Sequence, residues 1–185
     1  RLFGIIVSLT VISSCEDFLN LAPISSTSVN GFYQTASDFE QAVNGAYANL
    51  SGVYSYGYYL LFADLRADNT SMMVRGGGGE QQKISFDNFS LDATNEHMLT
   101  FWRASYVAIQ RANGVLSNID GVSFDQAKKD QYIGESKALR AIVYFNLVRI
   151  FGGVPIVLIG DVNIAESYNT PRSSVDEVYT VIIND

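Results

Sequence analysis

The sequence predicts an all-α protein made of stacked helical hairpins joined by long loops. Apolar residues recur at helical spacing in four separate segments, Ser-x-x-Glu or Ser-x-x-Gln capping boxes precede three of these, and glycine follows where the apolar pattern stops. Hydrophobic residues make up 48% of the 185 residues and charged residues only 17%. A chain of this length and composition can bury a substantial core.

The N-terminal segment is typical of a bacterial lipoprotein signal peptide. Residues 2–12 form an apolar run of signal-peptide length that is too short to span a bilayer, and the absence of methionine before Arg1 indicates a signal peptide truncated at its start. The tripeptide Ile12-Ser13-Ser14 then precedes Cys15, the only cysteine of the chain. A single cysteine excludes an internal disulfide. We therefore predict that residues 1–14 are removed and that Cys15 is lipidated; a buried free cysteine is the alternative.

A polar tether and the first helix follow. Residues 15–36 contain Pro23 and a Ser/Thr run, which is typical of a linker between the lipid and a folded domain. A capping box formed by Ser37 and Glu40 predicts the start of a helix that ends before Gly52. Its apolar stripe contains Phe39, Ala42, Val43, Ala46, Tyr47 and Leu50.

The next forty residues carry the weakest helical signal. Residues 52–69 are rich in tyrosine, and the run Gly76–Gly79 predicts a loop over residues 71–83, because glycine buries no side chain and loses much entropy on ordering. Residues 83–91 alternate apolar and polar side chains through Ile84 and Phe86, which favours a short extended piece.

Three further helices are predicted over residues 95–118, 125–151 and 174–185. Ser123-x-x-Gln126 and Ser174-x-x-Glu177 are read as the caps of the last two, and Trp102 and Tyr106 lie on the core stripe of the first. The apolar pattern is still running at Asp185, so we expect an N-terminal portion of a longer protein.

The helix over residues 125–151 is expected to be the structural centre. It is apolar over most of its circumference, which predicts neighbours on two sides. Tyr132, Ala141 and Phe145 match part of the tetratricopeptide spacing, in which the phenylalanine fills the gap beside a small residue. We therefore expect Phe145 to be buried.

Several blocks resemble the SusD/RagB family of outer-membrane nutrient-binding lipoproteins. These are GESKALRAIVYFNLVRIFGGVPIV at residues 134–157, TPRSSVDEVYTVIIND at residues 170–185, and CEDFLNLAP at the start of the mature chain. The resemblance implies a tetratricopeptide-like helical scaffold, with residues 37–185 forming an N-terminal domain that is incomplete at its C-terminus. It also implies a lipid anchor on the cell-surface side of the outer membrane, with Glu16 and Asp17 as the acidic tract that directs export.

The same resemblance implies an oligosaccharide or peptide ligand and a partner, a SusC-like TonB-dependent transporter. The ligand loop of the family corresponds to residues 66–90, and this stretch has no tryptophan. Tyrosines just before it offer ring faces, although they would alternatively brace the first helix. The candidate ligand-binding residues are Tyr56, Tyr58, Arg66, Asp68, Asn69, Arg75, Gln81 and Gln82.

Other functional classes have little support in the sequence. The formal net charge is −7 and no basic patch is evident, which argues against nucleic-acid binding. No carboxylate pair stands out as a catalytic pair, His97 is the only histidine, and no spacing indicates a metal site or a cofactor. We therefore predict a nutrient-binding lipoprotein that is not an enzyme. The alternative is a structural helical-repeat adaptor lipoprotein without a ligand.

Overall fold

The computed structural model describes residues 29–54, 59–67, 70–73, 78–160 and 169–185. These residues form helices and turns and contain no strand, which confirms the predicted all-α class. The chain divides into a unit of residues 1–34 and a unit of residues 35–185. In the first unit, the described part is the short helix α3 (Val29–Phe32), whose last ring meets Tyr33 edge to face.

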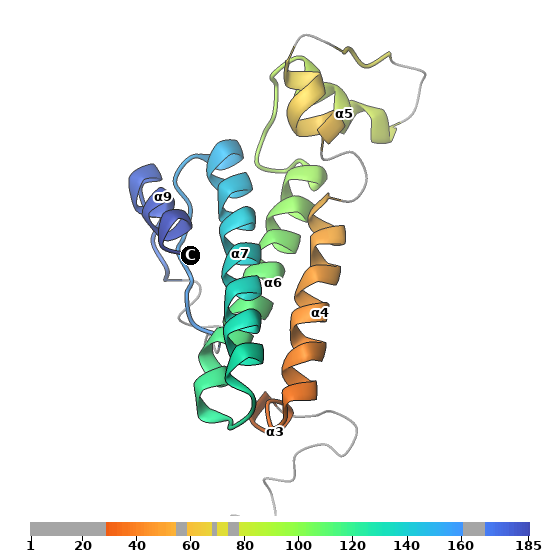
Figure 1. The fold of residues 1–185 in the computed structure, drawn as a ribbon. Helices are drawn as coiled ribbons and strands as arrows, with labels where there is room; N and C mark the ends of the chain where they lie inside the picture. The colour runs from red at the N-terminus through yellow and green to blue at the C-terminus, as the bar shows by residue number, and fades with distance from the viewer. Residues whose placement is uncertain (1–28, 55–58, 68–69, 74–77, 161–168) are drawn as a thin grey trace, which may run out of the picture. The chain divides into compact units, whose positions relative to one another are not determined.

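The second unit is built on three long helices that lie side by side (Figure 1). They are α4 (Ala36–Tyr54), α6 (Glu96–Asn118) and α7 (Gln126–Phe151), and a fourth helix, α9 (Val175–Asn184), packs on α7. Between α4 and α6 the described residues include the shorter helices η1 (Tyr59–Ala63), η2 (Asp64–Arg66) and α5 (Gly78–Asp87). A last short turn, η3 (Ile119–Gly121), ends α6.

Several polar side chains near each helix start could cap it, and the structure shows which one does. Ser174 and Glu177 form the predicted capping box of α9. At α7, however, the cap is Asp125, whose carboxylate accepts the Lys128 N–H at 3.0 Å, and the assignment to Ser123 was wrong. Both residue types cap well, and Asp125 is the one placed immediately before the first helical residue.

The start of α4 differs from the prediction in the same way. The Asp38 carboxylate accepts hydrogen bonds from the Thr35 backbone N–H at 2.7 Å and the Thr35 hydroxyl at 2.8 Å. The helix therefore begins at Ala36, one residue ahead of the predicted Ser37 cap. At α6, the cap is Asn95, which accepts from the backbone N–H groups of His97 and Met98.

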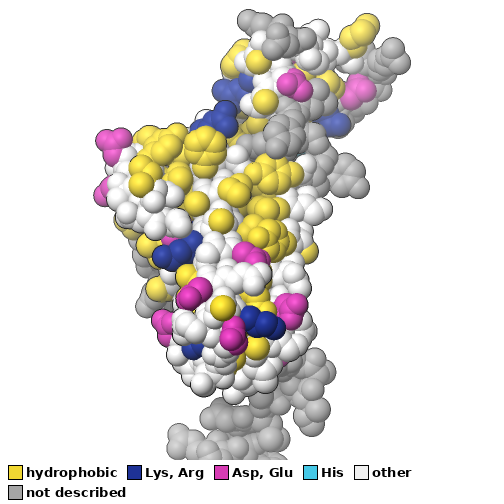
Figure 2. Space-filling model, in the orientation of Figure 1, with side chains coloured by type: hydrophobic (Ala, Val, Ile, Leu, Met, Phe, Trp, Pro, Cys, Tyr) yellow, Lys and Arg dark blue, Asp and Glu magenta, His cyan; other side chains and the backbone are white. Residues whose placement is uncertain are grey.

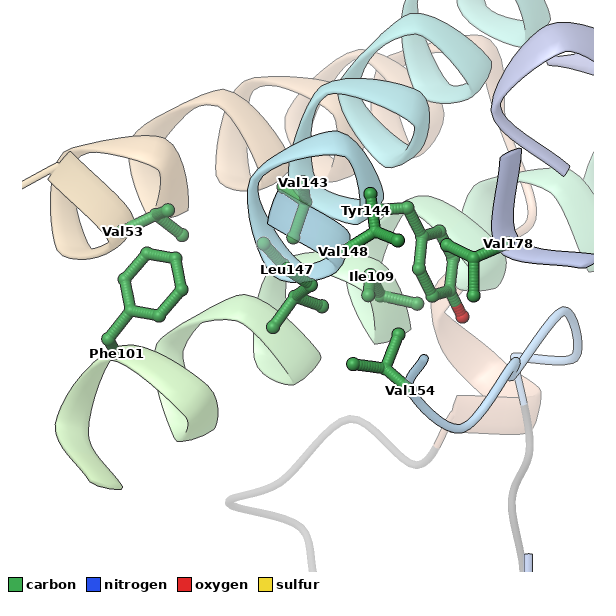
Figure 3. Close-up of a cluster of buried hydrophobic side chains, with 10 residues drawn as sticks. Val53, Phe101, Ile109, Val143, Tyr144, Leu147, Val148, Val154 and Val178 are labelled. Carbon is green, nitrogen blue, oxygen red and sulfur yellow. The ribbon is translucent and has the colours of Figure 1, made fainter. Parts of the chain in front are cut away.

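The main core lies where α7 meets its three neighbours, as Figure 3 shows. The apolar circumference of α7 is used on more than one side, which confirms its central position. Trp102 and Tyr106 are partly buried against this core, also as predicted. The buried members are Val53, Phe101, Ala108, Ile109, Val143, Tyr144, Leu147, Val148, Val154 and Val178.

Phe145 is not part of this core, and its predicted burial was wrong. Its side chain is 40% exposed, and the Arg149 guanidinium lies 5.0 Å from the ring centroid. The ring meets Tyr179 of α9 edge to face at 6.4 Å. Figure 2 shows hydrophobic side chains gathered over α7 and the adjoining parts of α4 and α9. A tetratricopeptide-like spacing alone therefore does not tell which apolar face of a helix is covered.

The extended piece predicted near residue 84 is the helix α5, so that prediction and part of the predicted loop were wrong. Only part of the glycine run precedes the helix, and the segment Glu80 to Lys83 consists of good helix formers. Phe86 is fully buried and packs edge to face on Phe62, with ring centroids 5.0 Å apart. This packing against a satellite cluster decides between helix and strand, which a short apolar run leaves ambiguous.

The described helices include none that combines the length and the apolar character needed to cross a bilayer.

Candidate functional site

The structure describes three of the eight predicted ligand-binding residues. Arg66 ends η2, and Gln81 and Gln82 lie in the first half of α5. The other five, Tyr56, Tyr58, Asp68, Asn69 and Arg75, lie outside the described residues, as does Cys15.

Gln82 joins α5 to the start of α6. Its backbone carbonyl accepts hydrogen bonds from the Ser85 hydroxyl at 2.7 Å and the Asn95 amide at 2.8 Å. Its side-chain Oε1 accepts the Glu96 backbone N–H at 2.9 Å. Most of its polar atoms are therefore used to hold two helices in register, so Gln82 shapes a site more than it offers free groups to a ligand.

A polar hollow of about 220 Å³ lies at this junction, and we call it the polar hollow below. Its wall combines one face of α5 with the segment that leads into α6. Two of the predicted residues come together here. The lining consists of Gln81, Gln82, Ser85, Ser90, Asp92, Thr94 and Asn95.

Asp92 provides a carboxylate that can accept hydrogen bonds in the polar hollow. One of its carboxylate oxygens accepts the Thr94 backbone N–H at 2.7 Å and the Thr94 hydroxyl at 2.6 Å. These two bonds lower the pKa of Asp92, so the carboxylate is ionised at neutral pH. A fixed carboxylate beside neutral hydroxyl and amide groups can accept hydrogen bonds from a polyhydroxylated ligand.

An exposed aromatic residue, Phe89, directly precedes Ser90 of the polar hollow in the sequence. Phe89 is 59% exposed, and its backbone has a φ of 57°. A non-glycine residue in this left-handed region costs on the order of 1–3 kcal/mol, and such residues cluster at functional sites as well as just after helix C-termini. The Arg66 guanidinium lies 5.5 Å from the ring centroid. The loop therefore presents a ring to solvent and supports it with a cation.

Phe89 also falls, less cleanly than Ile84 and Phe86, on the alternating apolar pattern of residues 83–91, and that pattern does not reveal this arrangement. The signal that would have found it is its polar surroundings. Asn88 and Ser90 flank the ring, and the Asn88 side chain accepts hydrogen bonds from the Ser90 N–H at 3.1 Å and hydroxyl at 2.5 Å. Such an Asx turn marks a surface loop, where an aromatic residue is not a core residue.

The hollow has binding chemistry and no catalytic pair. Asp92 is the only carboxylate among its described lining residues, whereas glycoside hydrolysis needs two carboxylates across one bond. No group of three or more metal-ligating side chains occurs in the part of the chain that the structure describes. What this geometry offers is hydrogen bonding beside an aromatic face.

Comparison with known families gives the class of protein. The model of a SusD-like family, described as "Starch-binding associating with outer membrane", matches residues 17–185. The chain belongs to the SusD-like family. This match confirms the resemblance seen in the sequence. The family description also indicates outer-membrane association, and SusD-like binding proteins are non-catalytic, as the sequence analysis expected for this chain.

Two curated SusD-like relatives come from Formosa agariphila. SusD-like protein P38 is 31% identical over 183 residues, which cover 99% of this chain and 35% of the relative. SusD-like protein P2 is 29% identical over 181 residues, which cover 97% of this chain and 35% of the relative. The chain thus spans about a third of the length of the curated relatives that it matches.

Solved SusD-like structures share the fold. A SusD-like protein from Bacteroides fragilis superposes with a TM-score of 0.70 at 22% identity, over 89% of this chain and 31% of that one. A laminarin-binding SusD-like protein gives 0.65 at 27% identity, over 81% and 32%. Surface glycan-binding protein A from Bacteroides fluxus gives 0.66 at 25% identity, over 82% and 32%. These neighbours confirm the tetratricopeptide-like helical scaffold.

Proposed function

We propose that this SusD-like chain is part of a protein that binds oligosaccharides at the cell surface without cleaving them. The observation that carries the proposal is the polar hollow, which contains the Asp92 carboxylate. The exposed residue Phe89 directly precedes Ser90, another residue that lines the polar hollow. The printed names of two structural neighbours, one laminarin-binding and one glycan-binding, support the same ligand class. A peptide ligand is the second candidate, because peptides also use aromatic faces and amide hydrogen bonds.

Each part of the site has a role in this proposal. The apolar C–H face of a sugar stacks on the Phe89 ring, where no hydrogen bond has to be broken. Hydroxyl groups on the other side donate to the Asp92 carboxylate and exchange hydrogen bonds with Thr94 and Gln81. Arg66 stabilises the position of the Phe89 ring through its cation–π contact. Because neither stacking nor hydroxyl hydrogen bonding moves a proton, binding needs no catalytic group.

We further propose that Cys15 anchors the protein to the outer membrane by lipid, facing outward, and that a SusC-like TonB-dependent transporter receives the ligand. The lipobox-like Ile12-Ser13-Ser14-Cys15 sequence supports the anchor, and the family description supports the membrane. Replacement of Cys15 by Ala should abolish incorporation of labelled palmitate and release the protein from membranes. Unchanged labelling would refute the anchor.

Binding measurements separate this proposal from a structural adaptor. Phe89→Ala in the full-length protein should weaken binding of a glycan by about tenfold, which corresponds to ~1.4 kcal/mol. Tyr47→Ala is the matched control, because Tyr47 is an aromatic residue that is 45% exposed on the distant helix α4. If no glycan or peptide of a broad panel bound to the wild type, the adaptor function would be favoured.

A further inference from the structure

A second depression, largely apolar, adjoins the polar hollow. It has a volume of about 460 Å³, within the range of small-molecule sites, and we call it the apolar cleft. The exposed residue Asp92 is one of its lining residues. The remaining lining residues are Leu91, Ala93, Met98, Leu99, Trp102 and Phe151.

The apolar cleft and the polar hollow share one wall. Residues 90–94 alternate between the two depressions: Ser90 and Thr94 line the polar hollow, and Leu91 and Ala93 line the apolar cleft. Asp92 lines both. A ligand seated in the polar hollow therefore has to pass only this residue to reach apolar surface.

Two aromatic residues that line the apolar cleft, Trp102 and Phe151, are packed against their neighbours. The Trp102 ring meets Phe151 edge to face with centroids 4.9 Å apart, and it packs on Tyr106 at the same distance with the two rings tilted. Both Trp102 and Phe151 also pack against the main core. The cleft is thus formed before a ligand arrives, which reduces the entropy cost of binding.

The aliphatic part of the lining does not suit an unsubstituted sugar. Leu91, Met98 and Leu99 offer no hydrogen bonds, and sugar hydroxyl groups placed against them would lose their bonds to water without replacement. An aryl or acyl group, in contrast, gains free energy in proportion to the apolar area that it buries there.

We propose that the apolar cleft binds an apolar substituent of the glycan, an aryl or acyl group, while the attached sugar occupies the polar hollow. The inference rests on the proposed glycan-binding function. The inference narrows the ligand class to a substituted glycan. Its apolar group is attached close to the bound sugar, because Asp92 lines both the polar hollow and the apolar cleft.

The chain provides its own reporter for this inference. Trp102 is the only tryptophan in the sequence and it lines the apolar cleft. Its fluorescence therefore responds to an apolar group in the cleft and little to a sugar held only in the polar hollow. The probes are phenyl and methyl glycosides of the same panel of di- and trisaccharides, with phenol as the sugar-free control.

The phenyl glycoside of a bound sugar should bind the full-length protein about tenfold more tightly than its methyl counterpart. It should also shift the part of the tryptophan emission that is missing from the Trp102→Phe variant. Leu99→Ser should reduce the affinity for the phenyl glycoside to that for the methyl glycoside and leave the latter unchanged. Val107→Ser is the matched control on the same helix, since the two side chains are 43% and 42% exposed and Val107 does not line the cleft. That variant should keep the preference for phenyl.

Three results would overturn the inference. If both glycosides bound equally and the Trp102 emission stayed constant, glycan binding would stand and the substituent subsite would be refuted. If phenol bound as tightly as the phenyl glycosides, the apolar cleft would be a general apolar docking surface, such as one for a protein side chain. If neither glycoside of any sugar bound, the proposed function would fail together with the inference.

Discussion

Arg140 of α7 donates two hydrogen bonds to the carboxylate of Asp185, from Nε to Oδ2 and from Nη2 to Oδ1, each 2.6 Å long. Both side chains are buried, at 8% and 6% exposure. The third nitrogen of the guanidinium donates to Asn113 Oδ1 at 2.6 Å, and the Asn113 amide donates to the Val157 carbonyl at 2.8 Å. Arg140 and Asn113 together thus link the C-cap of α9, α7, α6 and the segment after α7.

Removal of the carboxylate should therefore be costly. Asp185→Ala leaves the Arg140 charge buried without its partner, and breaking a buried pair in this way costs roughly 3–5 kcal/mol of unfolding free energy. Denaturant unfolding of Asp185→Ala and of the exposed control Asp176→Ala measures the difference. A loss no larger than that of the control would show that water replaces the pair.

Two tyrosines, the buried Tyr144 and the partly buried Tyr106, should make the fold sensitive to alkali. Burial raises the pKa of Tyr144 to about 12, and burial, followed by the neighbouring Tyr144, raises the pKa of Tyr106 as well. In the unfolded chain both titrate near ~10, so above that pH the unfolded state loses protons that the folded state keeps. These groups leave stability unchanged below pH ~10 and lower it as pH rises toward ~12.

Melting temperatures measured from pH 9 upward check this prediction. The Tyr144 hydroxyl accepts the Val157 N–H at 2.7 Å, and the Tyr106 hydroxyl donates to the Pro155 carbonyl at 2.7 Å. The double variant Tyr106→Phe/Tyr144→Phe should be less stable at neutral pH and should lose less further stability above pH ~10. The same alkaline slope in this variant would assign the effect to other groups.

The turn after α7 should not tolerate a side chain at Gly153. A Cβ there would lie 2.1 Å from the Ser173 carbonyl oxygen, which belongs to backbone and cannot rotate away. Gly153→Ala should cost ~1–3 kcal/mol or more by overpacking. Gly134→Ala is the control, because nothing lies within 4 Å of a Cβ at that exposed helical position. It should stabilise the protein by roughly 0.5–1 kcal/mol, and a reversed order in thermal unfolding would contradict the account.

Phe145 and Leu147 should differ sharply although both lie on α7. Leu147 is fully buried, so Leu147→Ala should cost ~2–5 kcal/mol. Phe145 is 40% exposed and contacts Tyr179 and Arg149 at the surface. Phe145→Ala should therefore cost well under half as much in denaturant unfolding. Equal losses would mean that Phe145 is covered in solution.

Helix positions could be predicted from the sequence because each long helix carries local signals. Helical spacing locates α4, α6, α7 and α9 to within a few residues, and glycine marks the end of α7. The predicted stop before Gly52 was wrong, because α4 runs through this glycine to Tyr54. The other failures concern contacts between segments. The burial of Phe86 against Phe62 makes α5 a helix, and Phe145 stays 40% exposed although Tyr179 and Arg149 contact its ring. Neither fact follows from local spacing.

The candidate site was predictable only in part, for the same reason. Gln81 and Gln82 were identified by their polarity within a loop region, and both line the polar hollow. Asp92 and Thr94 come from the entry to α6, and the turn that brings them to α5 is a tertiary feature. Phe89 carries the clearest functional signal, its left-handed backbone, which no spacing rule reveals.

The proposal that the protein binds glycans without cleaving them is tested most directly by calorimetry. The full-length protein is titrated with a glycan panel at low and high salt, and the mixture is then analysed for cleavage products. No lysine or arginine is among the described residues that line the polar hollow, so the account predicts saturable binding whose affinity changes less than about twofold with salt. It also predicts that the glycan is recovered intact. Absence of binding by every glycan, or release of shorter sugars during the titration, would contradict it.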